Sequence, residues 1–199
     1  MKRALDIIAA FLLIVLLIPL FLIISIIIKL TSSGPVLFYQ RRIGLNRKEF
    51  DIIKFRTMRI DTPSNVPTHM LENPGTFITP IGKVLRKTSL DELTQLFNIM
   101  KGDMSLVGPR PALYNQEDLI ELREQYGVHS MRPGLTGWAQ VNGRDELEIS
   151  AKVEYDRYYV ENWSIWLDIR ILLLTAVSVV RSKGVAEGRR ETVRSHEVI

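Results

Sequence analysis

Cysteine is absent from the 199-residue chain, which excludes disulfides, thiolate catalysis and four-cysteine metal sites. The three histidines are scattered and no H-E-x-x-H occurs, so a zinc enzyme is not expected. Neither G-x-x-x-x-G-K-S/T nor G-x-G-x-x-G is present, and P-loop and Rossmann chemistry are therefore unsupported. No two aspartates lie two positions apart, so the Asp-x-Asp of many metal-dependent glycosyltransferases is missing as well.

What the chain does contain is apolar sequence and clustered positive charge. Its hydrophobic fraction of 46% and positive mean hydropathy fit a membrane-associated protein better than a disordered one, and its length suits one globular domain plus a membrane element. Between positions 29 and 59 eight cations face two carboxylates: Lys29, Arg41, Arg42, Arg47, Lys48, Lys54, Arg56 and Arg59 against Glu49 and Asp51. This cluster predicts contact with anionic lipid headgroups or a phosphorylated substrate. No nucleic-acid-binding motif accompanies it.

The N-terminal segment predicts a membrane helix. Residues 4–28 carry one charge, Asp6, and the 22 uncharged residues 7–28 would reach about 33 Å as a helix. Pro19 removes the hydrogen bond to the Val15 carbonyl and kinks the helix. Both flanks are basic, which favours a re-entrant helix that breaks at Pro19 and returns to the cytosolic face. The alternative is a straight span with the N-terminus outside, and in either case the remaining chain is cytosolic.

Two short extended segments are expected next. Val36–Gln40 is predicted to be a strand, and Phe50–Met58 alternates in the manner of a strand. The alternation would place Lys54 and Arg56 on one face, where they could clamp a diphosphate or simply be solvated. Asp61–Gly75 is rich in Pro, Ser, Thr and Asn and predicts a long loop.

The stretch Leu85–Pro111 contains the main candidate site. Ser89 is predicted to be a helix N-cap, with Glu92 three residues later completing a capping box, and Lys101-Gly102 to end that helix. Acidic residues at a helix start are common without any catalytic role. Asp91, however, is not needed for the capping box, and two cations, Arg86 and Lys87, precede it. The pattern indicates a phosphate site that also holds a carboxylate. Two anions repel each other, so a carboxylate in a phosphate site is expected only where it binds a metal ion or takes part in the reaction.

A second polar cluster lies in residues 131–144. Arg132-Pro133-Gly134 predicts a type II turn with glycine at its third position. Four further polar side chains follow among three glycines: Thr136, Gln140, Asn142 and Arg144. This composition suits a loop whose backbone approaches a ligand closely, although a surface turn is the alternative.

The C-terminal third is predicted to be helical. Glu117–Gln125 is a charged helix, and several aromatic residues precede the apolar run 165–180. Asp168 and Arg170 within this run argue against a second membrane span. An amphipathic helix lying in the membrane interface is expected, with a core helix as the alternative.

Taken together, these motifs resemble a known family. They are the basic N-terminus with its Pro-broken helix, Lys54-Phe-Arg-Thr-Met58, Leu85-Arg-Lys-Thr-Ser-Leu-Asp-Glu-Leu93, Gly102-Asp-Met-Ser-Leu-Val-Gly-Pro-Arg-Pro111 and Arg132-Pro-Gly-Leu-Thr-Gly-Trp-Ala-Gln-Val-Asn-Gly-Arg144. The chain is similar from about Lys2 to Gly184 to the bacterial sugar transferases called small monotopic phosphoglycosyl transferases. The resemblance implies transfer of a phospho-sugar from a UDP-sugar to polyprenol (undecaprenol) phosphate with release of UMP, as the first membrane step of glycoconjugate assembly.

The resemblance also implies roles for individual residues. Asp91 would be the nucleophile that forms a phospho-sugar intermediate, Glu92 would assist the second half-reaction, and Mg²⁺ would be held by Asp91 and the diphosphate. The implied substrate-binding residues are Lys54, Arg56, Arg86, Pro109, Arg110, Pro111, Arg132, Thr136, Gln140, Asn142 and Arg144.

The expected fold class is α/β, mostly helical with short strands and monotopic. Residues 1–30 would form the re-entrant helix, 31–184 the cytosolic catalytic domain with its interfacial C-terminal helix, and 185–199 a polar tail. The expected location is the cytosolic face of the bacterial inner membrane, and the expected partners are the two substrates and the bilayer, without nucleic acid; an oligomer is compatible with this. The alternatives are a glycosyltransferase that releases UDP and a non-catalytic adaptor that binds anionic lipids.

Overall fold

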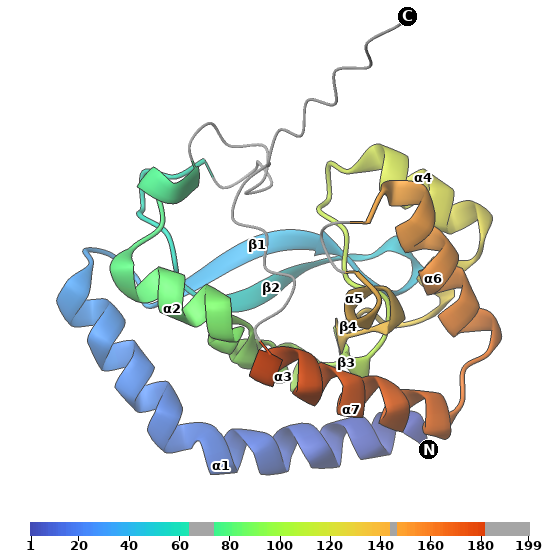
Figure 1. The fold of residues 1–199 in the computed structure, drawn as a ribbon, viewed down its shortest axis with the longest axis horizontal. Helices are drawn as coiled ribbons and strands as arrows, with labels where there is room; N and C mark the ends of the chain where they lie inside the picture. Colours follow the sequence, from blue (N-terminus) through green and yellow to red (C-terminus); the bar gives the residue numbers. More distant parts are fainter. Residues whose placement is uncertain (64–73, 144–146, 182–199) are drawn as a thin grey trace, which may run out of the picture.

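The computed structural model describes residues 1–63, 74–143 and 147–181. Its longest element, α1 (Lys2–Thr31), is a 30-residue helix that contains Pro19 and bends near its middle (Figure 1). The predicted kink is confirmed, while the chain remains helical through Pro19. Within the described ranges α1 is the one helix long and apolar enough to cross a membrane, and only 11% of its apolar window is buried.

The N-terminal end of α1 is fixed to the rest of the fold by its charged residues. Lys2 pairs with Asp168 of the C-terminal helix at 2.5 Å. Arg3 donates hydrogen bonds to the carbonyl oxygens of Ile99 (2.6 Å) and Met104 (3.1 Å). Asp6 is buried and accepts a hydrogen bond of 2.8 Å from the Ser105 hydroxyl. A charge inside an apolar helix is thus explained by a polar docking site on the domain.

The C-terminal end of α1 is held by Arg56. Its guanidinium donates to the carbonyl oxygens of Ser32 and Ser33 and to the Ser32 hydroxyl. Arg56 is only 5% exposed, and burial lowers its pKa. Both ends of α1 therefore contact the same folded body.

Strands β1 (Leu37–Ile43) and β2 (Glu49–Phe55) form an antiparallel pair in which Tyr39 lies opposite Ile53. They are joined by the 3₁₀ turn η1 (Leu45–Arg47). Both predicted strands exist, but β1 runs three residues further than predicted and β2 ends before Arg56. The prediction that Arg56 shares a strand face with Lys54 is therefore wrong: Arg56 lies beyond the strand, where the carbonyl oxygens at the end of α1 engage it.

The central stretch folds as three short helices: α2 (Pro80–Thr88), η4 (Leu90–Gln95) and α3 (Leu96–Lys101). The predicted capping box is wrong. Ser89 has φ +57°, ends α2 and makes no side-chain cap, while Thr79 caps α2 by accepting from the Gly82 amide. Arg86 and Lys87 thus lie in the last turn of a helix, where cations suit the exposed carbonyl groups. The predicted helix end at Gly102 is confirmed by its left-handed φ of 104°.

A second, parallel pair consists of β3 (Ser105–Val107) and β4 (Gly134–Thr136). Because Gly134 belongs to β4 and does not adopt a positive φ, the predicted type II turn is wrong. Gly134 is required for a different reason: a Cβ there would lie 2.1 Å from the Gly108 amide nitrogen. The backbone that approaches closely is the protein's own.

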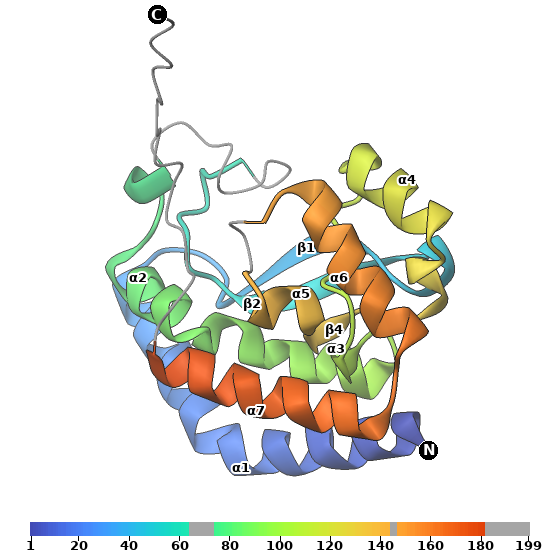
Figure 2. The same cartoon turned by 45° about the vertical axis from the view of Figure 1, so that its right-hand side comes forward.

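The remaining helices are α4 (Glu117–Gln125), α5 (Trp138–Val141), α6 (Ile149–Glu161) and α7 (Ile165–Arg181), with 3₁₀ turns η3 (Pro74–Thr76) and η5 (Val128–Ser130). The predicted α4 is confirmed at both ends. Helix α7 runs beside the N-terminal half of α1 in both views (Figures 1 and 2). Its large exposed apolar residues are Ile165, Trp166, Ile169, Leu172, Leu173, Leu174, Val177 and Val179. The fold is mostly helical with short strands, as predicted. The predicted polar tail lies outside the described residues.

Candidate active site

Asp91 and Glu92 lie in the first turn of η4, directly after the sharp change of direction at Ser89. Asp91 is 8% exposed and Glu92 is half-buried. Buried adjacent carboxylates are unfavourable unless cations compensate them. The structure brings three of the predicted cations to this pair, each from a different element: Lys54 from β2, Arg86 from α2 and Arg110 from the segment after β3.

Glu92 is held by two of these cations. Its Oε1 accepts hydrogen bonds from Lys54 Nζ (2.8 Å) and from Arg110 Nη2 (2.9 Å). Burial alone would raise the pKa of Glu92, but Arg110 and Lys54 together hold it well below its usual range. Glu92 is therefore ionised and fixed in orientation at neutral pH.

Asp91 differs from its neighbour. Its carboxylate accepts no hydrogen bond from the part of the chain that the structure describes. Burial and the neighbouring charge of Glu92 raise the pKa of Asp91 to about 6, against the opposing effect of Lys54, Arg86 and Arg110. Two carboxylates one residue apart are thus separated in protonation behaviour by their contacts, a pattern typical of catalytic pairs.

Arg86 has capacity to bind an anion. Its Nη1 lies 3.8 Å from the Met58 sulfur, a weak acceptor, and its Nε is buried without a partner among the described residues. A phosphate oxygen would satisfy such a donor far better than a thioether. Burial lowers the pKa of Lys54 in spite of the opposing charge of Glu92. A bound anion would stabilise the charged form of this ammonium group.

The polar residues of the predicted second cluster bind their own chain. Arg132 donates to the Gly102 carbonyl, Thr136 bonds with the Thr175 hydroxyl, Gln140 donates to the Leu135 carbonyl and Asn142 to the Trp138 carbonyl. None of them is among the groups that act on Asp91 or Glu92. Arg144 lies outside the described residues. Arg56 also lies apart, at the end of α1.

The site depends on residues that the apolar periodicity did not reveal. Asn98 accepts from the Ile53 amide (2.9 Å) and Thr94 donates to the Ile53 carbonyl (2.9 Å), so both satisfy the open edge of β2. The buried side of η4 and α3 therefore includes polar residues, while the apolar Phe97 and Met100 are exposed. The tighter winding of η4 shifts the buried face relative to a continuous α-helix.

A metal ion would find one carboxylate with uncommitted oxygens here, Asp91. No group of three histidine, cysteine, aspartate or glutamate side chains that could hold a metal occurs within residues 1–63, 74–143 and 147–181. A hard divalent cation bound at Asp91 would need further oxygen ligands from elsewhere, such as phosphate groups and water.

The structure thus defines a mostly helical protein in which a long apolar helix is joined to a domain where Lys54, Arg86 and Arg110 act on an adjacent pair of carboxylates. Comparison with known proteins gives the family. The sequence profile described as bacterial sugar transferase matches residues 1–182, so the chain belongs to that family, as the motifs predicted.

Three relatives illustrate this membership. The UDP-glucose:undecaprenyl-phosphate glucose-1-phosphate transferase of Escherichia coli (strain K12) is 43% identical over 182 residues, which cover 88% of this chain and 39% of that protein. The UDP-N-acetylgalactosamine-undecaprenyl-phosphate N-acetylgalactosaminephosphotransferase of Aeromonas hydrophila is 39% identical over 188 residues, covering 92% and 44%. The uncharacterized sugar transferase EpsL of Bacillus subtilis (strain 168) is 40% identical over 192 residues, covering 96% and 93%. The chain spans less than half the length of the first two relatives.

Proposed function

We propose that the chain transfers a phospho-sugar from a UDP-sugar to polyprenol phosphate, with undecaprenol phosphate the expected acceptor, and releases UMP. The observation that carries the proposal is the difference in hydrogen bonding between the two adjacent carboxylates. Glu92 is tied to Lys54 and Arg110, whereas Asp91 accepts no hydrogen bond from the described residues and lies among the same cations. The names of the two relatives that state a substrate agree with this reaction.

In the first half-reaction the Asp91 carboxylate attacks the sugar-proximal phosphorus of the UDP-sugar. A carboxylate–phosphorus bond forms, the bond from that phosphorus to the bridging oxygen breaks, and the bridging oxygen leaves with UMP. Lys54, Arg86 and Arg110 reduce the repulsion between the attacking carboxylate and the diphosphate. Arg86 can contribute its Nε, which has no hydrogen-bond partner among the described residues.

In the second half-reaction an oxygen of polyprenol phosphate attacks the same phosphorus and releases the Asp91 carboxylate. The product is a polyprenyl diphosphate sugar, and the aspartate returns to its starting state. Glu92, ionised and fixed by two cations, would orient the acceptor phosphate through Arg110 and Lys54 or take up a proton from it.

Magnesium fits this site as a cofactor shared with the donor. When bound, it would neutralise the diphosphate and stabilise the charge that develops on the leaving oxygen. Asp91 is the residue that would hold it, with the remaining ligands supplied by phosphate oxygens and water. This assignment also accounts for a carboxylate placed in a phosphate site.

The location we propose is the cytosolic face of the inner membrane, with α1 re-entrant. Support comes from the contacts at the two ends of α1. Arg3 and Asp6 bind one part of the domain and Arg56 binds the other end, so both ends lie on the domain's side. The exposed apolar face of α7, with Trp166 79% exposed, would lie in the same interface.

The decisive experiment is mass spectrometry of protein quenched after incubation with UDP-sugars and Mg²⁺ alone. We expect the peptide that contains Asp91 to gain the mass of the phospho-sugar, and Asp91→Asn to remain unmodified. An unmodified peptide under conditions of demonstrated turnover would contradict covalent catalysis.

Two other functions make different predictions. A glycosyltransferase with a lipid acceptor would release UDP, so identification of the nucleotide product separates it from the proposed reaction. A non-catalytic adaptor that binds anionic lipid would show no turnover in the wild-type protein. Loss of turnover in Asp91→Asn with unchanged membrane binding would exclude it.

A further inference from the structure

The segment that carries Arg110 is held almost entirely through its carbonyl groups. Pro109 and Pro111 have no backbone N–H, so the segment cannot pair as an ordinary strand. Its four successive carbonyl oxygens each accept a hydrogen bond from a different residue: Pro109 from the Gly134 amide (2.9 Å), Arg110 from Arg123 Nη1 (2.7 Å), Pro111 from Arg42 Nη1 (3.0 Å) and Ala112 from the Ile43 amide (3.0 Å). The path of this segment is therefore set by its donors.

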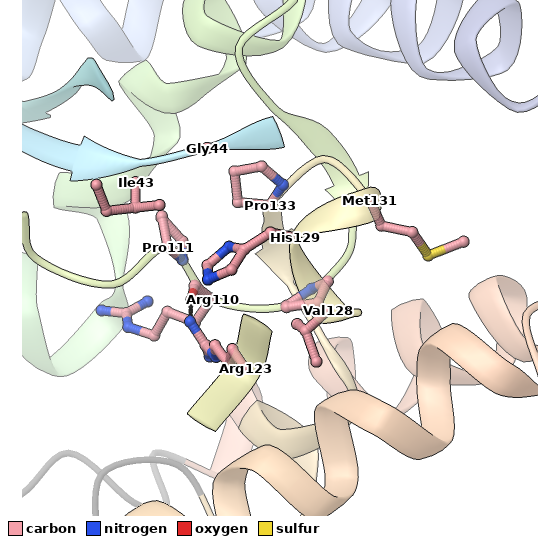
Figure 3. A pocket seen from close by; sticks show the side chains of 10 residues that line it. Ile43, Gly44, Arg110, Pro111, Arg123, Val128, His129, Met131 and Pro133 are labelled. Carbon is pink, nitrogen blue, oxygen red and sulfur yellow. Dashed lines mark hydrogen bonds between the residues drawn. The ribbon is translucent and has the colours of Figure 1, made fainter. Parts of the chain in front are cut away.

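Arg123 is the donor that acts on Arg110 itself. It lies on α4, is 4% exposed, and directs Nε (3.0 Å) and Nη2 (2.6 Å) to one oxygen of Asp156 on α6. This ion pair fixes the guanidinium and leaves Nη1 to meet the Arg110 carbonyl, as the dashed line in Figure 3 shows. A buried arginine–aspartate pair can commonly be replaced by apolar residues without loss of stability. Only an arginine, however, supplies the third donor at this position.

The hydrogen bond from Arg123 acts together with packing. Pro109 and Pro111 are buried, and a small pocket lies between Arg123, His129, Pro133 and the segment 109–111 (Figure 3). On the side of this pocket, the Arg123 hydrogen bond is a directional contact that fixes the Arg110 carbonyl.

We propose that Arg123, oriented by Asp156, is a positioning residue for Arg110. By holding the Arg110 carbonyl it sets how far the Arg110 guanidinium reaches toward Glu92, to which it donates over 2.9 Å. The inference rests on the proposed function only where Arg110 is taken to bind the UDP-sugar. The residues of this network, on α4 and α6, carry none of the motifs found in the sequence.

A double-mutant cycle tests the proposal. Arg123→Lys keeps the charge beside Asp156 but cannot also reach the Arg110 carbonyl in the same geometry. The double variant Arg123→Met/Asp156→Leu removes the pair without leaving a buried charge, which guards against misfolding. Arg157→Gln is the matched control, because Arg157 lies next to Asp156 in sequence and pairs with Glu161 on the surface.

Each change is made in the wild-type and in the Arg110→Ala background, and UMP release is measured against UDP-sugar concentration. We expect kcat/KM to fall about tenfold in the wild-type background, mostly through KM, and less than about twofold where Arg110 is absent. Equal losses in both backgrounds, or no loss in either, would overturn the proposal.

Arginine side-chain NMR in detergent provides a readout without turnover. The slowed Nη resonances of Arg110, which report its pairing with Glu92, should broaden in Arg123→Lys and remain in Arg157→Gln. Unchanged Arg110 resonances in Arg123→Lys would overturn the proposal even if the wild-type protein released no UMP. If the wild-type protein releases no UMP but its Arg110 resonances broaden in Arg123→Lys and remain in Arg157→Gln, the proposed function alone would be contradicted.

Discussion

At the scale of single residues, the two adjacent carboxylates of the site differ in pKa because their surroundings differ. Asp91 and Glu92 are adjacent, Lys54 and Arg110 act on both of them, and Arg86 acts on Asp91. Glu92 accepts two charge-assisted hydrogen bonds, which favour its ionised form, whereas Asp91 interacts with the cations only at longer range. Glu92 is therefore an anion of fixed orientation. Beside it, the ionised form of Asp91 is disfavoured, and its oxygens accept no hydrogen bond from the described residues.

The raised pKa of Asp91 predicts an acid limit for the first half-reaction. Since the pKa is about 6, the carboxylate is protonated and unreactive below that pH and ionised above it. We expect the single-turnover rate of UMP release, measured with UDP-sugar and no acceptor, to be half-maximal near pH 6. Glu92→Gln removes a charge that raises this pKa, so its residual rate should reach half-maximum at a lower pH. A wild-type midpoint near pH 4 would contradict the assignment.

Arg86 and Lys87 allow a matched comparison of neighbouring cations. Arg86 acts on Asp91, and its buried Nε has no partner in the part of the chain that the structure describes, whereas Lys87 is exposed. Arg86→Ala should reduce kcat/KM for the UDP-sugar about 100-fold, because a preorganised charge on a phosphate contributes roughly 3 kcal/mol. Lys87→Ala should reduce it less than about twofold. Similar losses for both variants would show that general positive charge, not the placement of Arg86, is what matters.

At the scale of secondary-structure elements, the sequence predicted the features that follow from local composition and periodicity. It did not predict the features that depend on contacts between distant segments. The apolar run of α1, its kink at Pro19 and the bounds of α4 follow from local composition. The division of residues 80–101 into α2, η4 and α3 does not, because the left-handed Ser89 is imposed by packing rather than by residue type.

The same distinction holds for the site. The proximity of the carboxylates and cations of the site could be predicted, because these residues belong to recognisable motifs: Asp91, Glu92, Lys54, Arg86 and Arg110. The buried pair Arg123–Asp156 could not, because its members are 33 positions apart in helices that otherwise look solvated. Four residues of the cluster 131–144 have the composition expected of ligand contacts, yet they bond within the protein. Arg132, Gln140 and Asn142 donate to backbone carbonyl groups, and Thr136 bonds with the Thr175 hydroxyl.

Asn98 provides a test of how η4 and α3 are joined to β2. Its side chain accepts from the Ile53 amide and donates to the Asp51 carbonyl, so Asn98→Ala leaves buried backbone groups without partners. We expect a loss of about 2–4 kcal/mol in the free energy of unfolding. Asn142→Ala, which removes one exposed hydrogen bond to the Trp138 carbonyl, should cost less than about 1 kcal/mol in the same denaturation experiment. Equal costs would contradict the role assigned to Asn98.

At the scale of the whole molecule, α1 contacts the domain at both of its ends. Strand β2 ends in Phe55, and the next residue, Arg56, holds the C-terminal end of α1. Ile99 of α3 and Ser105 of β3 hold its N-terminal end. Straightening α1 across a bilayer would break one of these two sets of hydrogen bonds or draw the domain into the apolar phase. Either outcome is costly, because two buried charges would lose their partners: Asp6 on α1 is bound by Ser105 of the domain, and Arg56 of the domain is bound to Ser32 and Ser33 at the end of α1.

The absence of cysteine makes the topology directly measurable. Ala4→Cys and Ser33→Cys place single thiols at exposed positions near the two ends of α1. If α1 is re-entrant, a membrane-impermeant maleimide should label both variants in inverted inner-membrane vesicles and neither in intact spheroplasts. A straight span would expose Ala4→Cys and Ser33→Cys on opposite sides, so labelling of one variant in each preparation would contradict the re-entrant arrangement. The hydrogen bonds of Arg3, Asp6 and Arg56 could not all form in a straight span, since the two ends of α1 would then lie on opposite sides of the bilayer.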